Sequence, residues 1–442
     1  MNNMERIVIH SDLNNFYASV ERKLNPDLLG KPVAVCGDKE LRHGIVLAKS
    51  EEAKKFGVKT AEPIWQAQRK CPDLIIVPPH FETYIRYSRM VREIYARYTD
   101  LIESYGIDEC WLDISTSTLL FPEYSGEKYI EIDGEKYYSD GFLTHLGDHI
   151  RNTVKRELGI TVSCGVSFNK VFAKLGSDLK KPDGTSVISK AHYKQTVYGL
   201  PVEDLLYVGK ATREKLYSMG LNTIGKLAAA DDDTIIKEFG KVGQNLLRNA
   251  RGQDDEAVRH MDDKREMKSI GNSSTYKEDI TDLRSIKRNL YILSESVASR
   301  LRESGQGLAD TVHLWVRYGN LMDFSVQKKV RHTALCGEIA EHAYDLFVRN
   351  VHPPFSVRSL GVTVSGFDNG VSQITYDEAC GNYSKRERVE RCVDAIRKKH
   401  GYSKLQRGIV AEVEGEMNND VKSTHLIKPA KIDYPEDTED DL

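Results

Sequence analysis

The segment that decides the fold is residues 7–21, IVIHSDLNNFYASVE. It opens with a short apolar run of β-branched residues, Ile7-Val8-Ile9, which predicts a buried strand. Phe16, Tyr17 and Val20 then follow a helical spacing. Asp12 is therefore expected where a strand gives way to a helix.

A second acidic segment is expected to lie near the first. Leu101–Tyr105 and Cys110–Ile114 read as two strands around Gly106-Ile107-Asp108-Glu109, so a hairpin carries two adjacent acids. If the two segments share a sheet, three carboxylates come within reach of divalent cations. Such oxygen ligands favour Mg²⁺ or Mn²⁺, and two ions suit in-line phosphoryl or nucleotidyl transfer. Spacing alone favours another interpretation, solvated acids at strand ends and turns.

Composition is typical of a multidomain globular protein. The 442 residues correspond to three domains at about 150 residues each, and no apolar run approaches the ~18 residues of a membrane span. Seven scattered cysteines, never two residues apart, argue against a disulfide framework or a zinc ribbon. The net charge is −3, but Asp433–Leu442 hold six carboxylates, and without these residues the net charge would be +3. No secretory signal is visible, so we expect a cytoplasmic protein that does not enter a membrane.

The rest of the chain alternates helical and strand patterns. Residues 119–141 look like an inserted loop or hairpin, short helices broken by glycine occupy Leu205–Asn249, and the charged stretch Arg259–Lys268 looks like a linker. The periodicity also predicts helices near 84–98, 170–181, 283–302 and 385–399, and strands near 160–166, 311–318, 324–330 and 357–367.

Several blocks of sequence resemble the Y family of translesion DNA polymerases. They are Asp12–Glu21 with Lys55-Phe56-Gly57-Val58, then Gly106–Asp113, then Val162–Ser167 with Phe172-Ala173-Lys174 and Lys181-Pro182-Asp183-Gly184, and Ser269-Ile270-Gly271-Asn272. Within the family the chain is most similar to the bacterial DNA polymerase IV group. Asn14, however, stands where that group usually carries a second Asp, as in polymerase V catalytic subunits, so the subgroup stays open.

The resemblance implies an α+β multidomain fold arranged as a right hand on primer-template DNA. It also implies template-directed, low-fidelity synthesis past damaged bases by a monomer. The modules use nearly the whole chain, which leaves little room for a proofreading exonuclease. The expected boundaries are 1–17 and 83–190 for the palm, 18–82 for the fingers, 191–258 for a thumb with a helix-hairpin-helix motif, 259–268 for a linker, 269–400 for a little finger, and 401–442 for a disordered tail.

The same resemblance implies a catalytic site with two Mg²⁺ ions, for which Mn²⁺ can substitute. Asp12 and Asp108 would bind both ions, and Glu109 would bind the ion that activates the primer 3′-hydroxyl. The carbonyl oxygen of Leu13 would complete the site of the nucleotide-bound ion. The primer hydroxyl then attacks the α-phosphorus of a dNTP and expels pyrophosphate.

Nucleotide contacts are expected from the helix after Asp12 and from a lysine further along the chain. Tyr17, next to Phe16, matches the family's steric gate, a ring under the incoming sugar that selects dNTP over rNTP. Without the motif, such a ring is more often a core aromatic residue. Lys181 matches a lysine that reaches the triphosphate, with a solvated surface lysine as the alternative.

The fingers depart from the family pattern. Glu51 and Lys54 stand where a Tyr and an Arg usually contact the triphosphate. Lys54 keeps a charge without the bidentate fork of arginine, and Glu51 would repel phosphate unless it points away or pairs with a lysine. Ile45 and Leu47 fall where the family roofs the nascent base pair, or they are core strand residues.

Contacts with DNA are expected in the thumb and in the last unit. Val208-Gly209-Lys210 resembles a hairpin that aims backbone N–H groups at a phosphate, with an ordinary turn between helices as the alternative. Basic residues on predicted strands are expected to track phosphates and to make binding salt-dependent. They are Lys328, Lys329, Arg331 and Arg358. Gln373-Ile374-Thr375-Tyr376 lies about where relatives carry a sliding-clamp peptide, although Asp377 replaces the usual aromatic residue.

Two other classes of protein stay open. A non-catalytic DNA-binding accessory protein could keep the fold, but the intact acids Asp12, Asp108 and Glu109 argue against it. Another palm-type nucleotidyl enzyme, such as a nucleotide cyclase, would need neither a hairpin thumb nor a little finger. It would leave residues 190–400 unexplained.

Overall fold

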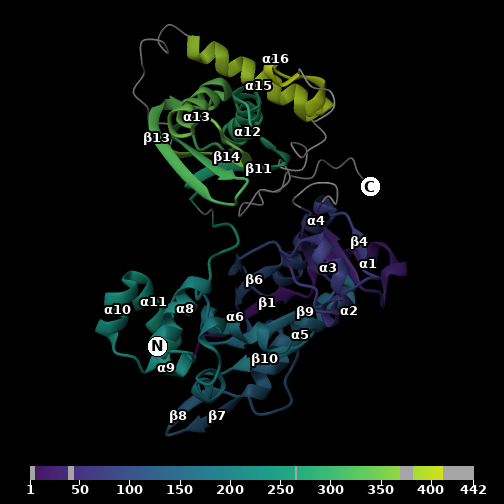
Figure 1. Ribbon diagram of the computed structural model, residues 1–442. Helices are drawn as coiled ribbons and strands as arrows, with labels where there is room; N and C mark the ends of the chain where they lie inside the picture. The colour runs from purple at the N-terminus through teal and green to yellow at the C-terminus, as the bar shows by residue number, and fades with distance from the viewer. Residues whose placement is uncertain (1–4, 38–43, 264–265, 369–381, 412–442) are drawn as a thin grey trace. The chain divides into compact units, whose positions relative to one another are not determined.

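The computed structural model describes residues 5–37, 44–263, 266–368 and 382–411. The chain folds as two compact units, which are considered separately (Figure 1). The first comprises Met1–Gly37 and Ile45–Asp263, and the second is formed mainly by Lys264–Leu442. Within the described ranges, no helix is long and apolar enough to cross a membrane.

A five-stranded sheet with the order β10-β9-β1-β6-β5 forms the centre of the first unit. Strand β1 (Val8–Leu13) pairs antiparallel with both β6 (Glu109–Asp113) and β9 (Val162–Ser167). At the edges, β5 (Ile102–Ser104) pairs antiparallel with β6, and β10 (Thr185–Ile188) runs parallel to β9. The predicted opening strand and acidic hairpin are confirmed, and β1 and β6 are direct neighbours.

Helices cover both faces of this sheet. α4 (Phe81–Tyr95) and α5 (Asp140–Leu158) share one hydrophobic core with β1, β6 and β9. α6 (Lys170–Leu179) packs on the other face, so close to β9 that a Cβ at Gly165 would stand 2.0 Å from the carbonyl oxygen of Ala173. Only glycine allows this approach. It brings α6 beside the strands that carry the acids.

Smaller elements surround the sheet in the sequence order that the patterns predict. α1 (Phe16–Leu24) follows β1, and a three-stranded sheet of β3 (Val46–Lys49), β2 (Val33–Cys36) and β4 (Ile75–Val77) has its own small core. The predicted insertion contains an antiparallel hairpin of β7 (Tyr129–Ile132) and β8 (Glu135–Tyr138). The remaining helices of the first unit are α2 (Glu51–Lys55), α3 (Ile64–Lys70), α7 (Tyr193–Val197), α8 (Lys210–Ser218), α9 (Ile224–Ala228), α10 (Asp232–Phe239) and α11 (Lys241–Ala250), with 3-10 turns at Pro26–Leu28, Thr118–Leu120 and Val202–Asp204.

The second unit has a four-stranded antiparallel sheet with the order β11-β14-β12-β13. Its strands are β11 (Ser269–Ile280), β14 (Val357–Phe367), β12 (Ala309–Tyr318) and β13 (Asp323–Thr333). α12 (Leu283–Ser304) and α13 (Cys336–Asn350) pack on one face and share a core with all of the strands (Figure 1). These two helices leave the other face of the sheet uncovered.

The described residues after position 400 form ordered elements, whereas the sequence predicted a disordered tail from 401. α15 (Asn382–His400) is followed by a 3-10 turn at Tyr402–Lys404 and by α16 (Gly408–Ala411). Arg407 pairs with Glu295 of α12 (Nε–Oε1 2.8 Å), which Arg397 also binds at 3.0 Å. The Glu295 side chain is 1% exposed, so two guanidinium groups hold one buried carboxylate. The packed second unit therefore reaches at least Ala411.

Replacing Arg407 with alanine is expected to destabilise the second unit by about 2 kcal/mol, because a buried carboxylate loses one of its two cationic partners. Amide hydrogen exchange in α12 and α16 of the full chain would measure the loss. Arg391→Ala is the matched control, since Arg391 is an exposed arginine that pairs with Glu387 of the same helix. Equal protection in the two variants would contradict the anchoring role of Arg407.

Candidate active site

Strand pairing brings the predicted acids together. Asp12 lies directly opposite Glu109 in the antiparallel register of β1 and β6, so both side chains point to the same face of the sheet. The backbone N–H of Leu13 donates to the carbonyl oxygen of Asp108 at 3.0 Å. The prediction that the two acidic segments adjoin in one sheet is therefore confirmed.

Basic side chains from α6 and the loop after it lie against two of these acids. Lys181 Nζ is 2.9 Å from Asp12 Oδ2 and 2.7 Å from Asp178 Oδ1. Lys174 pairs with Oε2 of Glu109. Sequence reasoning missed the contact of Lys174 because it joins residues 65 positions apart.

His10 is a further member of the site that sequence reasoning missed. Its Nε2 lies 3.2 Å from Glu109 Oε2, and its Nδ1 lies 2.8 Å from the hydroxyl of Ser177. Burial lowers the pKa of His10, so the imidazole is neutral near pH 7. The signal was available, since a strand places His10 and Asp12, two residues apart, on one face.

The acids differ strongly in their electrostatic environments. Burial, together with the charges of Glu109 and Asp12, raises the pKa of Asp108 to about 6. Burial also raises the pKa of Asp12, although Lys181 opposes this shift. For Glu109, burial acts in the same direction but is outweighed by His10 and Lys174, which lower its pKa to about 2. Negative charge is thus poorly compensated around Asp108.

The donor set fits a hard divalent cation, although the carboxylates are not gathered around one point. No group of three or more His, Cys, Asp or Glu side chains is arranged to hold a metal ion in the parts of the chain that the structure describes. The contacts with lysine and histidine use Oδ2 of Asp12 and Oε2 of Glu109. The other oxygen of each carboxylate has no hydrogen bond to a described residue. These oxygens and the crowded Asp108 carboxylate match the ligands that Mg²⁺ and Mn²⁺ prefer.

Tyr17 lies beside the acids and is held from behind by other aromatic rings. It stacks on Tyr84, with ring centroids 4.3 Å apart and 12° between the planes, and Phe81 packs edge-on against it. The Tyr84 hydroxyl donates to Glu21. Burial raises the pKa of Tyr17, and the charge of Asp108 raises it further. The ring therefore has a fixed position close to Asp108.

The ring of Phe16 does not face the site. It is 3% exposed and belongs to the core of the main sheet. Because the ring is buried, the predicted nucleotide contact of Phe16, which stays a prediction, would be made by its backbone.

Asn14 organises the loop that carries Lys181. Its Nδ2 donates to the hydroxyl of Ser163 at 2.8 Å, and its Oδ1 accepts from the backbone N–H of Asp183 at 2.8 Å. Asn14 is 5% exposed. The neutral amide thus ties β9 and the 181–184 loop to the end of β1, which explains an asparagine at this position.

In the fingers, the half-buried Glu51 side chain is fixed by two neighbouring side chains. Its Oε1 accepts from Asn15 Nδ2 at 3.0 Å and lies 3.7 Å from Lys54 Nζ. The pairing with a lysine that would reduce repulsion of phosphate is therefore present. Ile45, in an isolated bridge with Pro63, and Leu47 of β3 are both half-buried and lie outside the small core of this sheet.

The residues expected to contact DNA lie in the thumb and in the second unit, and they differ in how exposed they are. In the thumb, Val208 is mostly buried, Gly209 precedes α8, and the Lys210 side chain is 82% exposed at the start of that helix. A 3-10 turn at Val202–Asp204 precedes this hairpin.

The second unit corrects one prediction. Lys328 lies opposite the core residue Val312 and pairs with Asp345 of α13 at 2.7 Å, so it points to the helix-covered face. Its neighbour Lys329 lies opposite Thr311 on the other face and pairs with Asp310 at 2.8 Å. Arg331 is exposed and Arg358 is half-buried. Lys328 is therefore not a phosphate-tracking residue of the uncovered face.

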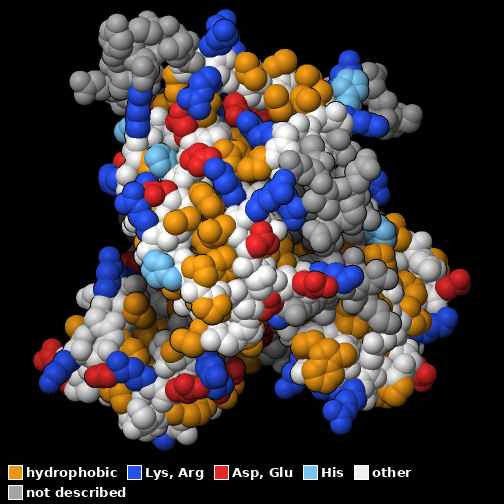
Figure 2. All heavy atoms as spheres, turned by 45° about the horizontal axis from the view of Figure 1, so that its top comes forward, with side chains coloured by type: hydrophobic (Ala, Val, Ile, Leu, Met, Phe, Trp, Pro, Cys, Tyr) orange, Lys and Arg blue, Asp and Glu red, His pale blue; other side chains and the backbone are white. Residues whose placement is uncertain are grey.

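The expected clamp-binding stretch at Gln373 lies outside the described residues. Over the face of the molecule in Figure 2, Lys and Arg side chains are interspersed with Asp and Glu, in keeping with the nearly balanced net charge.

Comparisons with known proteins agree with this architecture. The family model described as the impB/mucB/samB family matches residues 11–178, and the model of its C-terminal domain matches residues 267–376. A model of the DNA polymerase-iota thumb domain matches residues 203–254. A solved Y-family DNA polymerase chimera matches with a TM-score of 0.68 and 25% sequence identity. The match covers 82% of this chain and 99% of the chimera. The chain belongs to the Y family of DNA polymerases.

Its curated relatives include DNA polymerase IV proteins. That of Acetivibrio thermocellus is 43% identical over 415 residues, covering 93% of this chain and 99% of the relative. DNA polymerase IV 1 of Bacillus subtilis is 34% identical over 420 residues, which cover 92% of this chain and 94% of the relative. The family is one of template-directed, low-fidelity translesion polymerases that depend on divalent metal and lack proofreading. The predicted right-hand α+β fold is confirmed, and the cyclase and accessory alternatives are wrong.

Proposed function

We propose that this chain extends DNA primers with dNTPs past damaged template bases, using two Mg²⁺ ions for which Mn²⁺ can substitute. The observation that carries this proposal is the direct pairing of Asp12 with Glu109 across β1 and β6, next to Asp108. One buried acid, Asp12, beside the half-buried Asp108 and Glu109 has an energetic cost that a structural role would not require.

In this proposal Asp12, Asp108 and the Leu13 carbonyl hold the metal ions, with Glu109 on the primer side. Bound divalent ions neutralise triphosphate charge and lower the pKa of the primer hydroxyl. Glu109 stays ionised near pH 7 because His10 and Lys174 lower its pKa to about 2. Lys181 lies beside Asp12, where its ammonium group meets the incoming triphosphate as a point charge.

The rest of the chain positions nucleotide and DNA. We assign Tyr17 to the sugar, Lys54 to the triphosphate, and Ile45 and Leu47 to the roof of the base pair. The N–H groups at Gly209 and Lys210 begin α8, where a helix N-terminus attracts phosphate. Lys329, Arg331 and Arg358 belong to the sheet of the second unit and would make binding salt-dependent.

We retain the domain boundaries expected from the sequence, except that the little finger extends from 269 to at least 411. That extension follows from the packing of Arg407 and Val410. Clamp binding near Gln373, a monomeric state and a cytoplasmic location stay predictions.

Primer extension tests the proposal. The full chain, with labelled primer, all four dNTPs and MgCl₂, is expected to extend primers on undamaged and abasic templates, and EDTA is expected to stop extension. Protein that binds the primer-template but never extends it with either Mg²⁺ or Mn²⁺ would contradict the proposed reaction.

Lys181→Ala is expected to raise the KM for dNTP by about tenfold, because a charge-assisted contact with the triphosphate is lost. Single-nucleotide incorporation at increasing dNTP concentration would measure this change. Lys181→Arg should restore part of the affinity, and Lys180→Ala, at the exposed neighbouring lysine, should leave KM unchanged. A KM that is unaffected in Lys181→Ala would remove this lysine from the nucleotide site.

A further inference from the structure

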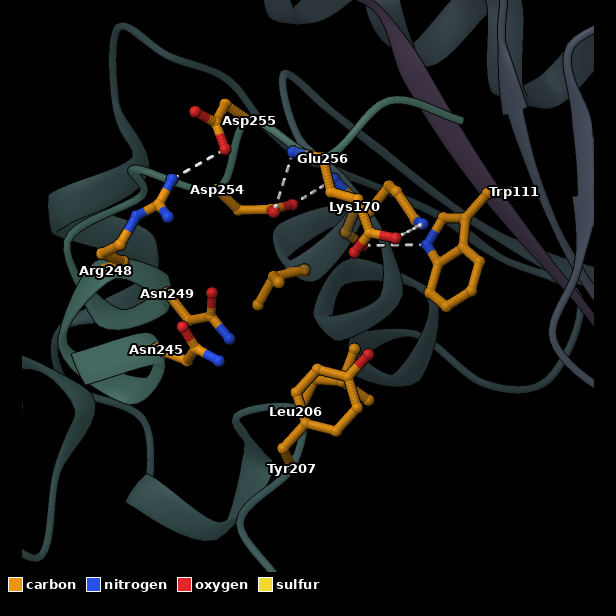
Figure 3. A pocket seen from close by; sticks show the side chains of 11 residues that line it. Trp111, Lys170, Leu206, Tyr207, Asn245, Arg248, Asn249, Asp254, Asp255 and Glu256 are labelled. Carbon is orange, nitrogen blue, oxygen red and sulfur yellow. Dashed lines mark hydrogen bonds and ion pairs between the residues drawn. The ribbon is translucent and has the colours of Figure 1, made fainter. Parts of the chain in front are cut away.

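A pocket of about 190 Å³ lies in the first unit between the main sheet and the thumb (Figure 3). Trp111 lies opposite His10 on the same face of the sheet as Asp12 and Glu109, but none of the residues proposed for catalysis lines the pocket. Trp111 and Lys170 come from β6 and the start of α6, and α11 forms another wall. The residues after α11, Asp254-Asp255-Glu256, form the acidic part of the rim.

An unpartnered amide points into this pocket. Asn249 of α11 is 8% exposed, yet its carboxamide makes no hydrogen bond to any residue that the structure describes. Asn245, one helical turn earlier, lines the same wall, and Figure 3 shows both side chains directed from α11 toward the pocket. Because the Asn249 carboxamide lines the pocket and has no partner among the described residues, it is available to a ligand with complementary hydrogen-bonding groups.

The charges around the pocket favour a cation. Lys170 Nζ is already balanced by the buried Glu103 at 2.8 Å, and Glu256 lies 3.1 Å away as a second acid. Arg248 is paired with Asp255 at 2.7 Å. Asp254 accepts backbone N–H groups of Lys170 and Glu256 and has no basic partner among the described residues. The acids of the pocket therefore exceed its bases, which disfavours phosphate groups and nucleic acid.

An aromatic surface completes the pocket. The Tyr207 side chain projects beside Leu206 opposite the asparagines in Figure 3, and Tyr207 is 61% exposed. Burial raises the pKa of the Tyr207 hydroxyl, and the nearby charge of Glu256 raises it further, as expected in a region of negative potential. A flat ring next to carboxylates and amide oxygens is suited to a planar cation.

We propose that this palm–thumb pocket binds an arginine side chain of a partner protein. The guanidinium group has five donors in one plane, which can meet the oxygens of Asn249, Asn245 and Glu256 while the plane lies against Tyr207. A lysine ammonium group would use fewer of these oxygens and would stack less well. Docking here would place a partner next to the thumb without covering the catalytic acids.

Ligand-observed NMR with the full chain tests this inference at the weak affinity expected of one side chain. The probe is the peptide acetyl-Ser-Arg-Ser-amide, and its matched control carries citrulline, which has the same shape without the charge. We expect at least about tenfold weaker binding of the citrulline peptide. We also expect the lysine peptide and spermidine to bind more weakly than the arginine peptide. Equal binding of arginine and citrulline peptides, or of arginine and spermidine, would overturn the proposal.

Variants locate the binding. Asn249→Ala and Glu256→Gln are expected to weaken binding of the arginine peptide by about tenfold and fivefold, whereas Asn249→Asp should tighten it because a charge is added. Gln244→Ala is the matched control, since Gln244 is an exposed amide of α11 that does not line the pocket. Primer extension by all four variants should stay at the native level. Unchanged peptide affinity in both Asn249 variants would place the binding elsewhere.

Discussion

Replacing Asp108 with asparagine is expected to lower the rate of primer extension by about 10³-fold or more while DNA binding persists. The substitution keeps the size of the side chain but removes the charge that divalent ions require, and metal-dependent stabilisation of the transition state is worth several kcal/mol. Extension rates at saturating DNA and dNTP, together with DNA affinity, would measure the two effects.

The control for this prediction is Asp113→Asn. Asp113 ends β6, the strand that begins directly after Asp108, lies opposite Val8 rather than Asp12, and pairs with Arg6 at 3.3 Å. It should extend primers at nearly the native rate. We also expect Mn²⁺ to raise the thermal midpoint of the native protein more than that of Asp108→Asn. If Asp108→Asn extends primers within tenfold of the native rate, Asp108 is not a catalytic metal ligand.

Replacing Tyr17 with alanine is expected to raise ribonucleotide incorporation relative to dNTP incorporation on the order of 10²-fold. Tyr84 stacks behind the ring at 4.3 Å, so the ring cannot move away from a 2′-hydroxyl. Removing it opens space for the hydroxyl without touching the acids. The ratio of kcat/KM for a matched rNTP and dNTP would report the change.

Tyr17→Phe separates the ring from its hydroxyl. Because exclusion is steric, the phenylalanine variant should keep the native preference for dNTP. DNA affinity should be unchanged in both variants. The assignment of Tyr17 as the gate is wrong if Tyr17→Ala still rejects rNTPs as strongly as the native protein does.

The local elements could be predicted because their signals are local. The strand at Val8–Leu13, the hairpin around Asp108 and Glu109, and the glycine-broken helices of the thumb follow from periodicity and turn residues within about twenty positions. The motif at Asp12–Glu21 was sufficient to recognise the family. The predicted tail, in contrast, began too early, directly after the last predicted helix, because the buried pairing of Arg407 with Glu295 leaves no local pattern.

Side-chain direction is what the sequence predicts least well. Phe16 and Tyr17 are neighbours on one helix, yet the Phe16 ring is buried in the core whereas Tyr17 feels the charge of Asp108. Lys328 and Lys329 alternate across β13, so one pairs with Asp345 of α13 and the other with Asp310 on the opposite face. The sequence alone does not show which face of an edge strand the helices cover, and a shift of the strand register by one residue moves every side chain to the opposite face.

Sequence alone determined the order of the elements, the identity of the acids and the family, because these depend on residue type and spacing. Tertiary structure alone decided which side chains surround each acid: Lys181 at Asp12, and the neutral His10 with Lys174 at Glu109. The pairing of Asn14 with Ser163 and the unpartnered Asn249 are likewise products of packing. Electrostatic and hydrogen-bond energies fall off within a few ångströms, so they depend on distances that exist only once strands and helices from distant parts of the chain have packed together.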